Sequence, residues 1–413
     1  MSEFPKVTRR RLLAGGAAVA AAGAGGYEAF RPTAGPQPVA PGDQPSGLPV
    51  RQFAWNATLR QDRYGNPEPP RHDRLVFFDV VGRPGAGHRT RLEAALRTLE
   101  RRFAWGPDGL LFTVGWGHDY FARTLRRQSP VPRARSLSNF ELPSIDGYDV
   151  VLHLAADDEA RLLAVENALT HGARVEGLHG AIELSEVLAW RETRTGFTGA
   201  GLPAAHQDTG GIPGGRPVSP GAPLFMGFKS ALKRNQASED AVAIPSGPFA
   251  QGTTMAVSYM RLRLDSWYQD LDDGQRVARM YAPQMTPEEV RRVRTDATGD
   301  PKLLGQAIRR YGVIGHSQTT TRARRHGKPL ILRRDFDTVD GGQAGLHFVS
   351  LQRSIDDFVR TRTAMNASSA QLQNPAITDT VNNGINEFIF VLKRGNYVIP
   401  PRAARSFPTL PAA

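Results

Sequence analysis

The 413-residue sequence contains no cysteine. Zinc–thiolate and iron–sulfur sites are therefore excluded, because cysteine sulfur holds both kinds of centre. The sequence also lacks a convincing membrane span near its N-terminus, where the Ala/Gly run is too short and too rich in glycine. An exported protein that avoids stray oxidation is expected to look like this.

Acidic residues are outnumbered, with 40 Asp and Glu against 52 Lys and Arg, which gives a formal net charge of +12. A surface this basic could attract nucleic acid or anionic lipid by electrostatic steering. The basic residues are scattered, however, and the sequence shows neither a basic helix nor a groove of interleaved aromatic residues. We therefore expect no nucleic-acid partner.

The N-terminus is typical of a twin-arginine export signal. Arg9 and Arg10 stand before Leu12 and Leu13, and a weakly apolar run continues to about residue 26. Residues 1–30 are thus predicted to address the chain to the twin-arginine export machinery, with "AGA" (22–24) as a cleavage site. An uncleaved signal anchor is the alternative, so the expected location is periplasmic, extracellular or membrane-associated.

Residues 31–55 are rich in proline and glycine and predict a linker or extended arm. The N-terminal half, 56–220, then offers a strand at 74–82, a helix at 88–103, strands at 109–117 and 148–158, a helix at 159–171, and a strand-like edge at 181–197. This order predicts a ferredoxin-like arrangement.

The C-terminal half, 221–413, follows a Gly/Pro loop at 208–223 and repeats the style. A strand that becomes helical is expected over 253–268, strands over 330–336 and 346–352, and helices over 354–365 and 380–392. The sequence therefore predicts an α+β protein of two ferredoxin-like halves whose sheets face each other. Edge strands on the two halves leave a homodimer open.

Several segments, in consistent order from about 74 to 402, resemble the dye-decolorising peroxidases. They are "FTVGWGHDYF" (112–121), "LHLAADDEA" (152–160), "LFMGFKSA" (224–231), "GPFAQGTTMAVSYMRLRLDSWY" (247–268), "GHSQ" (315–318), "LILRRDF" (330–336), "GLHFVSLQRSIDDFV" (345–359) and "NEFIFVLKRGNYVIPP" (386–401). The resemblance implies a haem protein of the dimeric α+β barrel type that binds haem b. The export signal fits the secreted branch of that family.

The resemblance places His316 at the proximal ligand of the haem iron. Such a ligand is a neutral imidazole whose other N–H donates to an acceptor. His326, in a predicted turn, is the rival and is expected to be exposed. The position of the family's acidic acceptor matches Asn383, with Asp379 and Glu387 close by, and a neutral partner would leave the iron easier to reduce.

On the distal face, the resemblance assigns Arg334 to the family's catalytic arginine, a fixed cation for the charge that develops as the O–O bond breaks. Arg333 would alternate to the other side of the strand and could hold a haem propionate.

The family's G-x-x-D-G motif reads Gly227-Phe228-Lys229-Ser230-Ala231 here. Gly227 and Phe228 are expected against the haem, and Ser230 replaces the catalytic aspartate. Serine could orient a water, at a cost of about 10²–10⁴-fold in rate if the general acid–base step is lost. Glu239 and Asp240 could fold back to supply the acid, although solvated loop acids are the simpler interpretation.

These residues predict a peroxidase that reduces hydrogen peroxide and oxidises a bulky organic reductant, with activity weakened at Ser230. One alternative is an exported haem-binding or iron-handling protein without turnover. The other is a barrel without haem, in which His316 is an ordinary loop residue.

Overall fold

The computed structural model describes residues 47–63, 65–176, 178, 182–229, 235–291 and 301–409. All of them lie in one compact unit, Asp43–Ala413. The export signal predicted over 1–30 lies outside the described residues. Within the described ranges, none of the helices is both long and apolar enough to cross a bilayer.

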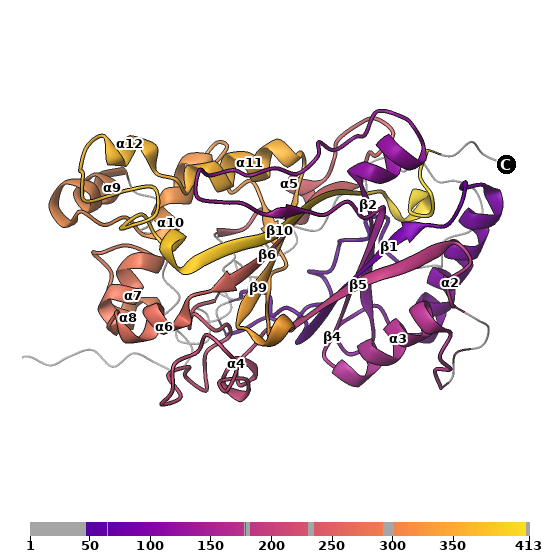
Figure 1. Ribbon diagram of the computed structural model, residues 1–413, viewed down its shortest axis with the longest axis horizontal. Helices are drawn as coiled ribbons and strands as arrows, with labels where there is room; N and C mark the ends of the chain where they lie inside the picture. Colours follow the sequence, from indigo (N-terminus) through magenta and orange to yellow (C-terminus); the bar gives the residue numbers. More distant parts are fainter. Residues whose placement is uncertain are drawn as a thin grey trace, which may run out of the picture. The chain divides into compact units, whose positions relative to one another are not determined.

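The N-terminal half is a four-stranded antiparallel sheet with two helices on its outside (Figure 1). Its strands lie in the order β2-β4-β1-β5. The elements are β1 (His72–Val80), α2 (Ala86–Arg102), β2 (Leu111–Gly117), β4 (Val150–Ala156), α3 (Glu159–His171) and β5 (Leu188–Phe197). This is the predicted ferredoxin-like arrangement.

The C-terminal half repeats that strand order as β8-β9-β6-β10. Its strands are β6 (Thr253–Leu262), β7 (Leu332–Arg333), β8 (Phe336–Thr338), β9 (Gly345–Gln352) and β10 (Ile389–Ile399), and β7 pairs beside β8 on β9. Its principal helix is α11 (Ile355–Ala364). The predicted α+β fold of two ferredoxin-like halves is thus confirmed.

Short helices and turns connect these elements. The helices are α4 (Leu202–Ala205), α5 (Glu239–Val242), α6 (Leu264–Gln269), α7 (Asp273–Met280), α8 (Pro287–Arg291), α9 (Pro301–Gln306), α10 (His316–Thr319) and α12 (Ser368–Gln371). Single π- or 3₁₀-turns occupy Tyr120–Thr124, Ala307–Tyr311, Thr320–Ala323, Asp340–Gly342, Asn386–Phe388 and Arg402–Ala404. A further strand, β3 (Ser144–Ile145), pairs with β10.

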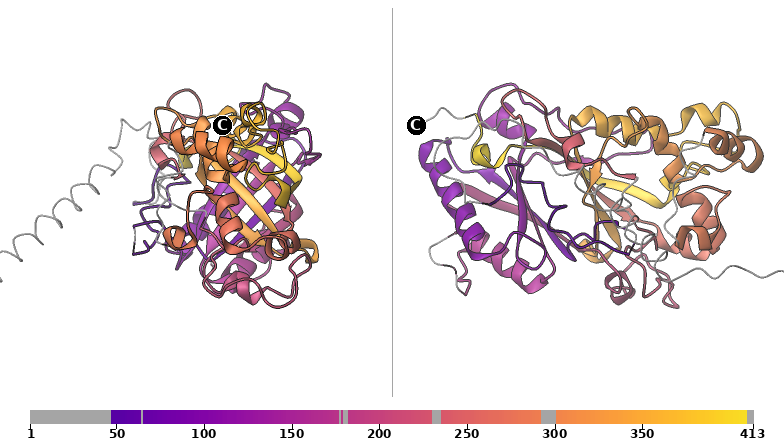
Figure 2. Two further views of the ribbon diagram at one scale, coloured as in Figure 1. Left: turned by 90° about the vertical axis from the view of Figure 1, so that its left-hand side faces the viewer. Right: turned by 180° about the vertical axis from the view of Figure 1, so that it is seen from behind.

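Two strand contacts join the halves into a closed ring. Phe197 of β5 pairs with Asp337 of β8, and β10 pairs with β2 through Tyr397↔Gly117. Figure 2 shows from behind how β10 (yellow) crosses from the C-terminal half to the N-terminal one. Closure leaves the two sheets without long free edges.

Alternation along the strands divides the side chains between the inside and the outside of the ring. Leu75 and Phe77 of β1 point inward and meet Met255, Val257 and Val349 from the other half. Their neighbours on β1 point outward, under α2 and α3. Each sheet therefore has an outer face that helices must cover.

Two expectations fail within the described residues. The segment 380–392 is not a helix: it contains a turn at Asn386–Phe388 and the start of β10. Ile389 and Val391 are buried whereas Phe390 and Leu392 are exposed, so the apolar residues follow a period of two rather than 3.6. The end of the predicted 31–55 linker is also packed, because Phe53 and Trp55 are each only 1% exposed.

The contact between β2 and β10 generates a prediction. A Cβ on Gly117 would lie 2.2 Å from the Tyr148 carbonyl oxygen, a backbone atom that cannot easily yield. We expect Gly117→Ala to lower the free energy of unfolding by about 1–3 kcal/mol. Gly87→Ala, in the exposed first turn of α2 with no atom within 4 Å of its Cβ, should instead be neutral or gain up to about 1 kcal/mol. Denaturant unfolding of the two variants measures both, and equal stabilities would contradict the close contact.

Candidate functional site

The outer face of the C-terminal sheet forms one wall of a large cavity. The cavity encloses about 1460 Å³, including the space open to solvent at its mouth. The sheet contributes mostly apolar side chains from three neighbouring strands: Met260 and Leu262, Leu346 and Phe348, and Ile389 and Val391. The opposite wall comes from α10 and α11.

His316 begins α10 and lines this cavity. Its Nδ1 is buried without a hydrogen-bond partner among the described residues. Burial, together with the charges of Arg333 and Arg362, lowers the pKa of His316 to about 3. The imidazole is therefore neutral at neutral pH, with a ring nitrogen available as a ligand.

The segment 382–384 lies directly against His316. Ile314 forms a β-bridge with Asn383, and a Cβ on Gly384 would approach the His316 Cα to 2.9 Å. The Asn383 amide donates to the Asp379 carbonyl at 2.6 Å, while its Oδ1 is buried without a partner in the described part of the chain. A neutral acceptor and an unused imidazole nitrogen thus belong to adjoining segments.

Of the two nearby acids, Glu387 forms an ion pair with Arg279 at 3.1 Å. Asp379 contacts the segment through its backbone carbonyl, which accepts the side-chain amides of Asn383 and Asn386. Of the three acceptors considered from the sequence, Asn383 is the one whose backbone pairs beside the histidine.

The segment from the end of β7 into β8 turns alternate side chains toward the cavity. Arg333, Asp335 and Asp337 line it. The same side of β9 presents Phe348 and Leu346, as the strand register requires. The cation that faces the cavity from this segment is therefore Arg333.

Arg334 points the other way. Its Nη2 donates to Asn56 Oδ1 at 2.9 Å and to Glu239 Oε1 at 3.1 Å, and its guanidinium lies 5.4 Å from the Trp55 ring centroid. Glu239 also accepts the Trp55 backbone N–H at 2.8 Å. Arg334 and Glu239 therefore form an internal ion pair away from the cavity lining, and Glu239 is not the solvated loop acid that the sequence suggested.

The loop that carries the degenerate motif lies at the cavity, but its key serine cannot be placed. Phe228 and Lys229 line the cavity, and Gly227 has a φ of +87°, a value that favours glycine. The Tyr268 hydroxyl donates to the Phe225 carbonyl at 2.5 Å and fixes the start of the loop. Ser230 lies outside the described residues.

Asp335 and Asp337 line the cavity but were not expected there from the sequence. Both are buried, with 6% and 0% exposure. The signal was present in "RRDFD" (333–337), where charged residues alternate, but the sequence does not show which set faces the helices. A shift of one residue in the strand register would turn the other set of side chains toward the helices.

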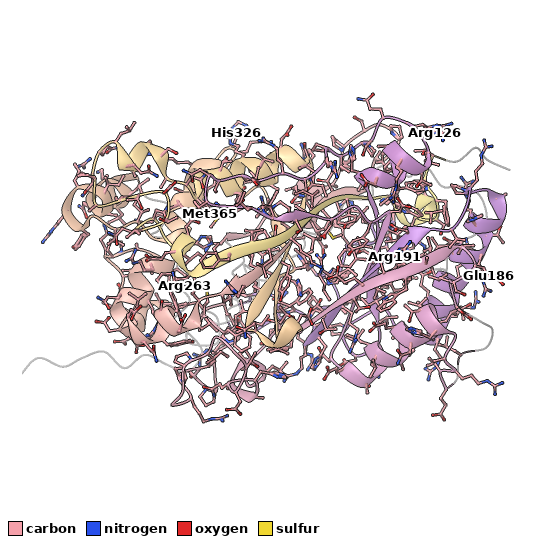
Figure 3. The ribbon with its side chains drawn as sticks, viewed as in Figure 1. Arg126, Glu186, Arg191, Arg263, His326 and Met365 are labelled. Carbon is pink, nitrogen blue, oxygen red and sulfur yellow. The ribbon has the colours of Figure 1, made fainter. Side chains whose placement is uncertain are left out.

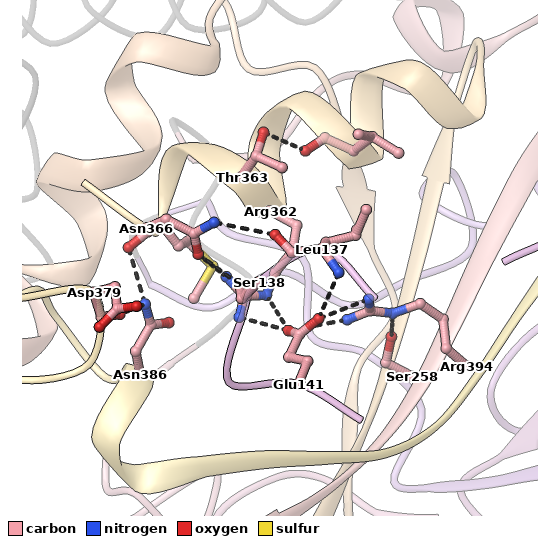
Figure 4. Close-up of polar contacts among 12 residues, drawn as sticks. Leu137, Ser138, Glu141, Ser258, Arg362, Thr363, Asn366, Asp379, Asn386 and Arg394 are labelled. Carbon is pink, nitrogen blue, oxygen red and sulfur yellow. Dashed lines mark hydrogen bonds and ion pairs between the residues drawn. The ribbon is translucent and has the colours of Figure 1, made fainter. Parts of the chain in front are cut away.

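Glu141 was also missed, and it ties the cavity walls together (Figure 4). It accepts hydrogen bonds from Arg362 of α11 at 2.8 Å and from Arg394 of β10 at 2.9 Å. Both arginines line the cavity. The carboxylate is 3% exposed, so a loop from the N-terminal half bridges a helix and a strand of the C-terminal half.

These residues suit a porphyrin rather than a bare metal ion. Across the described ranges, no three His, Asp or Glu side chains gather to hold a metal. A lone neutral histidine is, however, the usual proximal ligand of a haem iron, whose other ligands come from the ring. Lys229, Arg324 and Arg333 at the lining could pair with propionates.

Comparisons with known proteins agree with this fold. The model of a family of unknown function, DUF7405, matches residues 70–401. No curated protein matches the sequence.

Among solved structures, the chain is similar to a DyP-type peroxidase from Cellulomonas bogoriensis, at 20% identity over 83% of this chain and 93% of that one, with a TM-score of 0.55. A protein assigned to the DyP-type peroxidases from Shewanella oneidensis gives 16% identity, coverage of 84% and 96%, and a TM-score of 0.56. A DypB variant from Rhodococcus jostii, in complex with haem, gives 14% identity, coverage of 86% and 98%, and a TM-score of 0.52. At these identities the likeness shows a shared fold.

The Glu141 bridge generates a second prediction. Burial alone would raise its pKa, but Arg362 and Arg394 outweigh burial and lower the pKa of Glu141. Its contribution to stability is therefore present above the ordinary glutamate pKa and is lost as the pH falls through the lowered value. Glu141→Gln should cost about 3–5 kcal/mol at neutral pH, because it leaves two buried guanidiniums without a charge partner.

The matched control is Glu186→Gln, whose side chain is 78% exposed (Figure 3). It should change stability by less than about 0.5 kcal/mol. Unfolding curves collected between acidic and neutral pH test both changes. A Glu141→Gln variant as stable as the control would show that the bridge contributes little.

Proposed function

Because this chain belongs to DUF7405, a family of unknown function, and has the fold of the DyP-type peroxidases, we propose that it is a haem-dependent peroxidase that reduces hydrogen peroxide and oxidises bulky organic substrates. The observation that carries the proposal is His316: a half-buried, neutral imidazole with a solvent-shielded Nδ1, at the wall of a large cavity that is mostly apolar. Burying a histidine whose Nδ1 has no partner is costly unless the ring has a task.

Bound haem would supply an iron centre that exchanges electrons with peroxide and with the organic substrate. His316 would hold the iron through one ring nitrogen, and the N–H of the other would donate a hydrogen bond to the adjacent Asn383 Oδ1. A neutral acceptor donates less electron density than a carboxylate would.

Arg333 takes the cationic role in this proposal. It is permanently charged and presents fixed donors, so it can orient peroxide and stabilise negative charge on oxygen. The resemblance assigned that role to Arg334, but the side chain of Arg334 is occupied by Glu239 and Asn56. The apolar wall of Met260, Leu346 and Ile389 would keep water from the reacting oxygen atoms.

Export in the folded state, through the signal proposed over residues 1–30, would suit a protein that takes up its cofactor before it leaves the cell. A second candidate is a haem-binding or iron-handling protein without turnover. The observation that favours it is Ser230, which stands where the motif of the resembling family has its acid.

Haem binding is tested by a matched pair of histidine variants. His316→Ala should abolish the Soret band of the haem-loaded protein, because no other described histidine lines the cavity. His326→Asn should leave the band unchanged, since His326 is exposed in the Arg325–Lys328 turn (Figure 3). A normal Soret band in His316→Ala would refute the ligand assignment.

The two neighbouring arginines provide the test of turnover. Arg333→Ala should slow the reaction with peroxide by about 10²–10³-fold, the usual loss when one charge-stabilising donor is removed. Arg334→Ala should keep the rate close to that of the parent protein. It should instead lower the free energy of unfolding, because it leaves the buried Glu239 carboxylate without its cationic partner. Stopped-flow spectra after mixing with hydrogen peroxide measure the rates.

The reverse result, with Arg334 essential and Arg333 dispensable, would overturn the side-chain assignment. Haem binding without any peroxide-dependent oxidation of dyes or phenols by the parent protein would favour the second candidate.

A further inference from the structure

Asp337 is the most deeply buried carboxyl group at the cavity. Its exposure is 0%, and its Oδ2 accepts the Phe225 backbone N–H at 2.5 Å. Its Oδ1 has no hydrogen-bond partner within the described ranges, although the side chain lines the cavity. One oxygen thus anchors the loop at 224–229, and the other is left for something inside the cavity.

Asp335 stands two residues away on the same side of the chain. It is 6% exposed and also lines the cavity. The register of β8 on β9 sets Asp337 opposite Leu346, and continuing that register sets Asp335 opposite Phe348. Two carboxyl groups therefore share one apolar wall, beside Arg333.

Two carboxyl groups so close in a poorly solvated place do not both ionise readily. Burial, together with the neighbouring charge of Asp335, raises the pKa of Asp337 well above its ordinary value, and the Phe225 N–H offsets only part of this. Of the two, Asp337 is accordingly the one whose surroundings favour the protonated, neutral form. Its partnerless oxygen can then carry a proton into the cavity.

We propose that Asp337, with Asp335, is the proton-carrying group of this cavity and replaces the acid that the 227–231 loop lacks. The inference rests on the proposed peroxidase function. It concerns residues on a strand, whereas the motif of the resembling family supplies its acid from a loop.

The proton account balances within the pair. Ionised Asp335 accepts one proton from hydrogen peroxide, and neutral Asp337 gives one proton to the oxygen that leaves as water. The charge of the pair is the same before and after, and the two exchange a proton to reset. The two electrons that break the O–O bond are the contribution of the cofactor.

Other charged groups face the same space. Arg333 comes from the same segment, Arg394 from β10, Arg362 from α11, His316 from α10, and Lys229 and Arg324 from loops. Arg362 and Arg394 are engaged by Glu141. Any pH dependence must therefore be assigned by comparing variants rather than from one profile.

Asp337→Asn separates the proton from the anchor. The amide carbonyl can still accept the Phe225 N–H, but the side chain can no longer give up a proton. Asp337→Ala removes both functions. Asp265→Asn, at an exposed position at the start of α6, is the matched control.

The first readout does not need haem. The full-length protein at neutral pH should show an infrared band of a protonated carboxyl group, which disappears in Asp337→Asn and persists in Asp265→Asn. A second readout is stability against pH. An acid with a raised pKa in the folded state loses stability as the pH rises above its unfolded value of about 3.9, so the melting temperature of Asp337→Asn should exceed that of the parent by a margin that grows with pH.

The third readout is the rate of the peroxide reaction in haem-loaded protein. Asp337→Asn should lower it by about 10²–10⁴-fold with the Soret band intact. If Asp337→Asn keeps the parent rate and only Asp337→Ala loses it, Asp337 merely positions the loop and the proposal is wrong. An infrared difference spectrum between the parent protein and Asp337→Asn that shows no lost carboxyl band would also overturn it; the comparison is by difference because burial also raises the pKa values of Asp73 and Glu239.

Failure of the proposed function gives a different pattern. If the parent protein binds no haem, the proton role falls with the peroxidase. The infrared and melting experiments would still show whether Asp337 is the neutral carboxyl group.

Discussion

The cavity depends on one buried carboxylate, Glu141, and the two arginines that enclose it. Arg362 belongs to the helix that covers the cavity, and Arg394 belongs to the strand that forms its floor. Two buried guanidiniums on facing walls would repel each other and separate the walls. Because Glu141 comes from the connection between β2 and β4, the N-terminal half supplies the charge that allows the C-terminal half to enclose a space. The ring of strands makes this possible, since the pairing of β10 with β2 brings that connection alongside.

The closing of the strands into a ring explains why the candidate site lies outside the ring rather than inside it. The inner faces of both sheets are filled by large side chains from each half, among them Phe77, Phe336 and Tyr397. The outer face of the N-terminal sheet is covered by two regular amphipathic helices, α2 and α3, which pack tightly over it. On the C-terminal sheet, one regular helix and several short segments cover the outer face. The space that they leave unfilled is the cavity. The polar groups that face this space are then the residues from which function must be argued.

Much of this could be predicted from residue patterns, and the failures have physical causes. Apolar periodicity located α2, α3, α11 and nearly every strand, because each buries one face. The same criterion failed at 380–392, where Phe390 and Leu392 are apolar but exposed, so that a strand with period two reads as a helix. Phe53 and Trp55 were assigned to a linker because proline and glycine dominate the residues before them, whereas burial depends on partners far away in the chain.

The candidate site shows a sharper limit. His316 and the segment containing Asn383 could be proposed from the order of the segments and from the resemblance. A loop residue and the segment next to it are still recognised when the alignment is wrong by one or two residues. The choice between Arg333 and Arg334 could not be predicted, because neighbouring residues on an extended segment face opposite sides. The structure shows which of the two faces the cavity: Arg334 binds Glu239 and Asn56 on one side of the segment, and Arg333 lines the cavity on the other. Asp335 and Asp337 follow from the same geometry.

Charge balance links these features into one argument. The described lining holds five Lys and Arg side chains, of which Arg362 and Arg394 share the single charge of Glu141. The lining itself therefore holds more basic than acidic side chains, although Lys229 is paired with Asp62. A neutral His316 avoids adding to that excess, which agrees with the direction of its pKa shift. An occupant that carries carboxylates on an otherwise apolar plane would suit a lining that combines an apolar sheet face with this excess of basic side chains. The charges of the walls therefore favour a porphyrin with carboxylate groups, the class of cofactor that the lone His316 also favours.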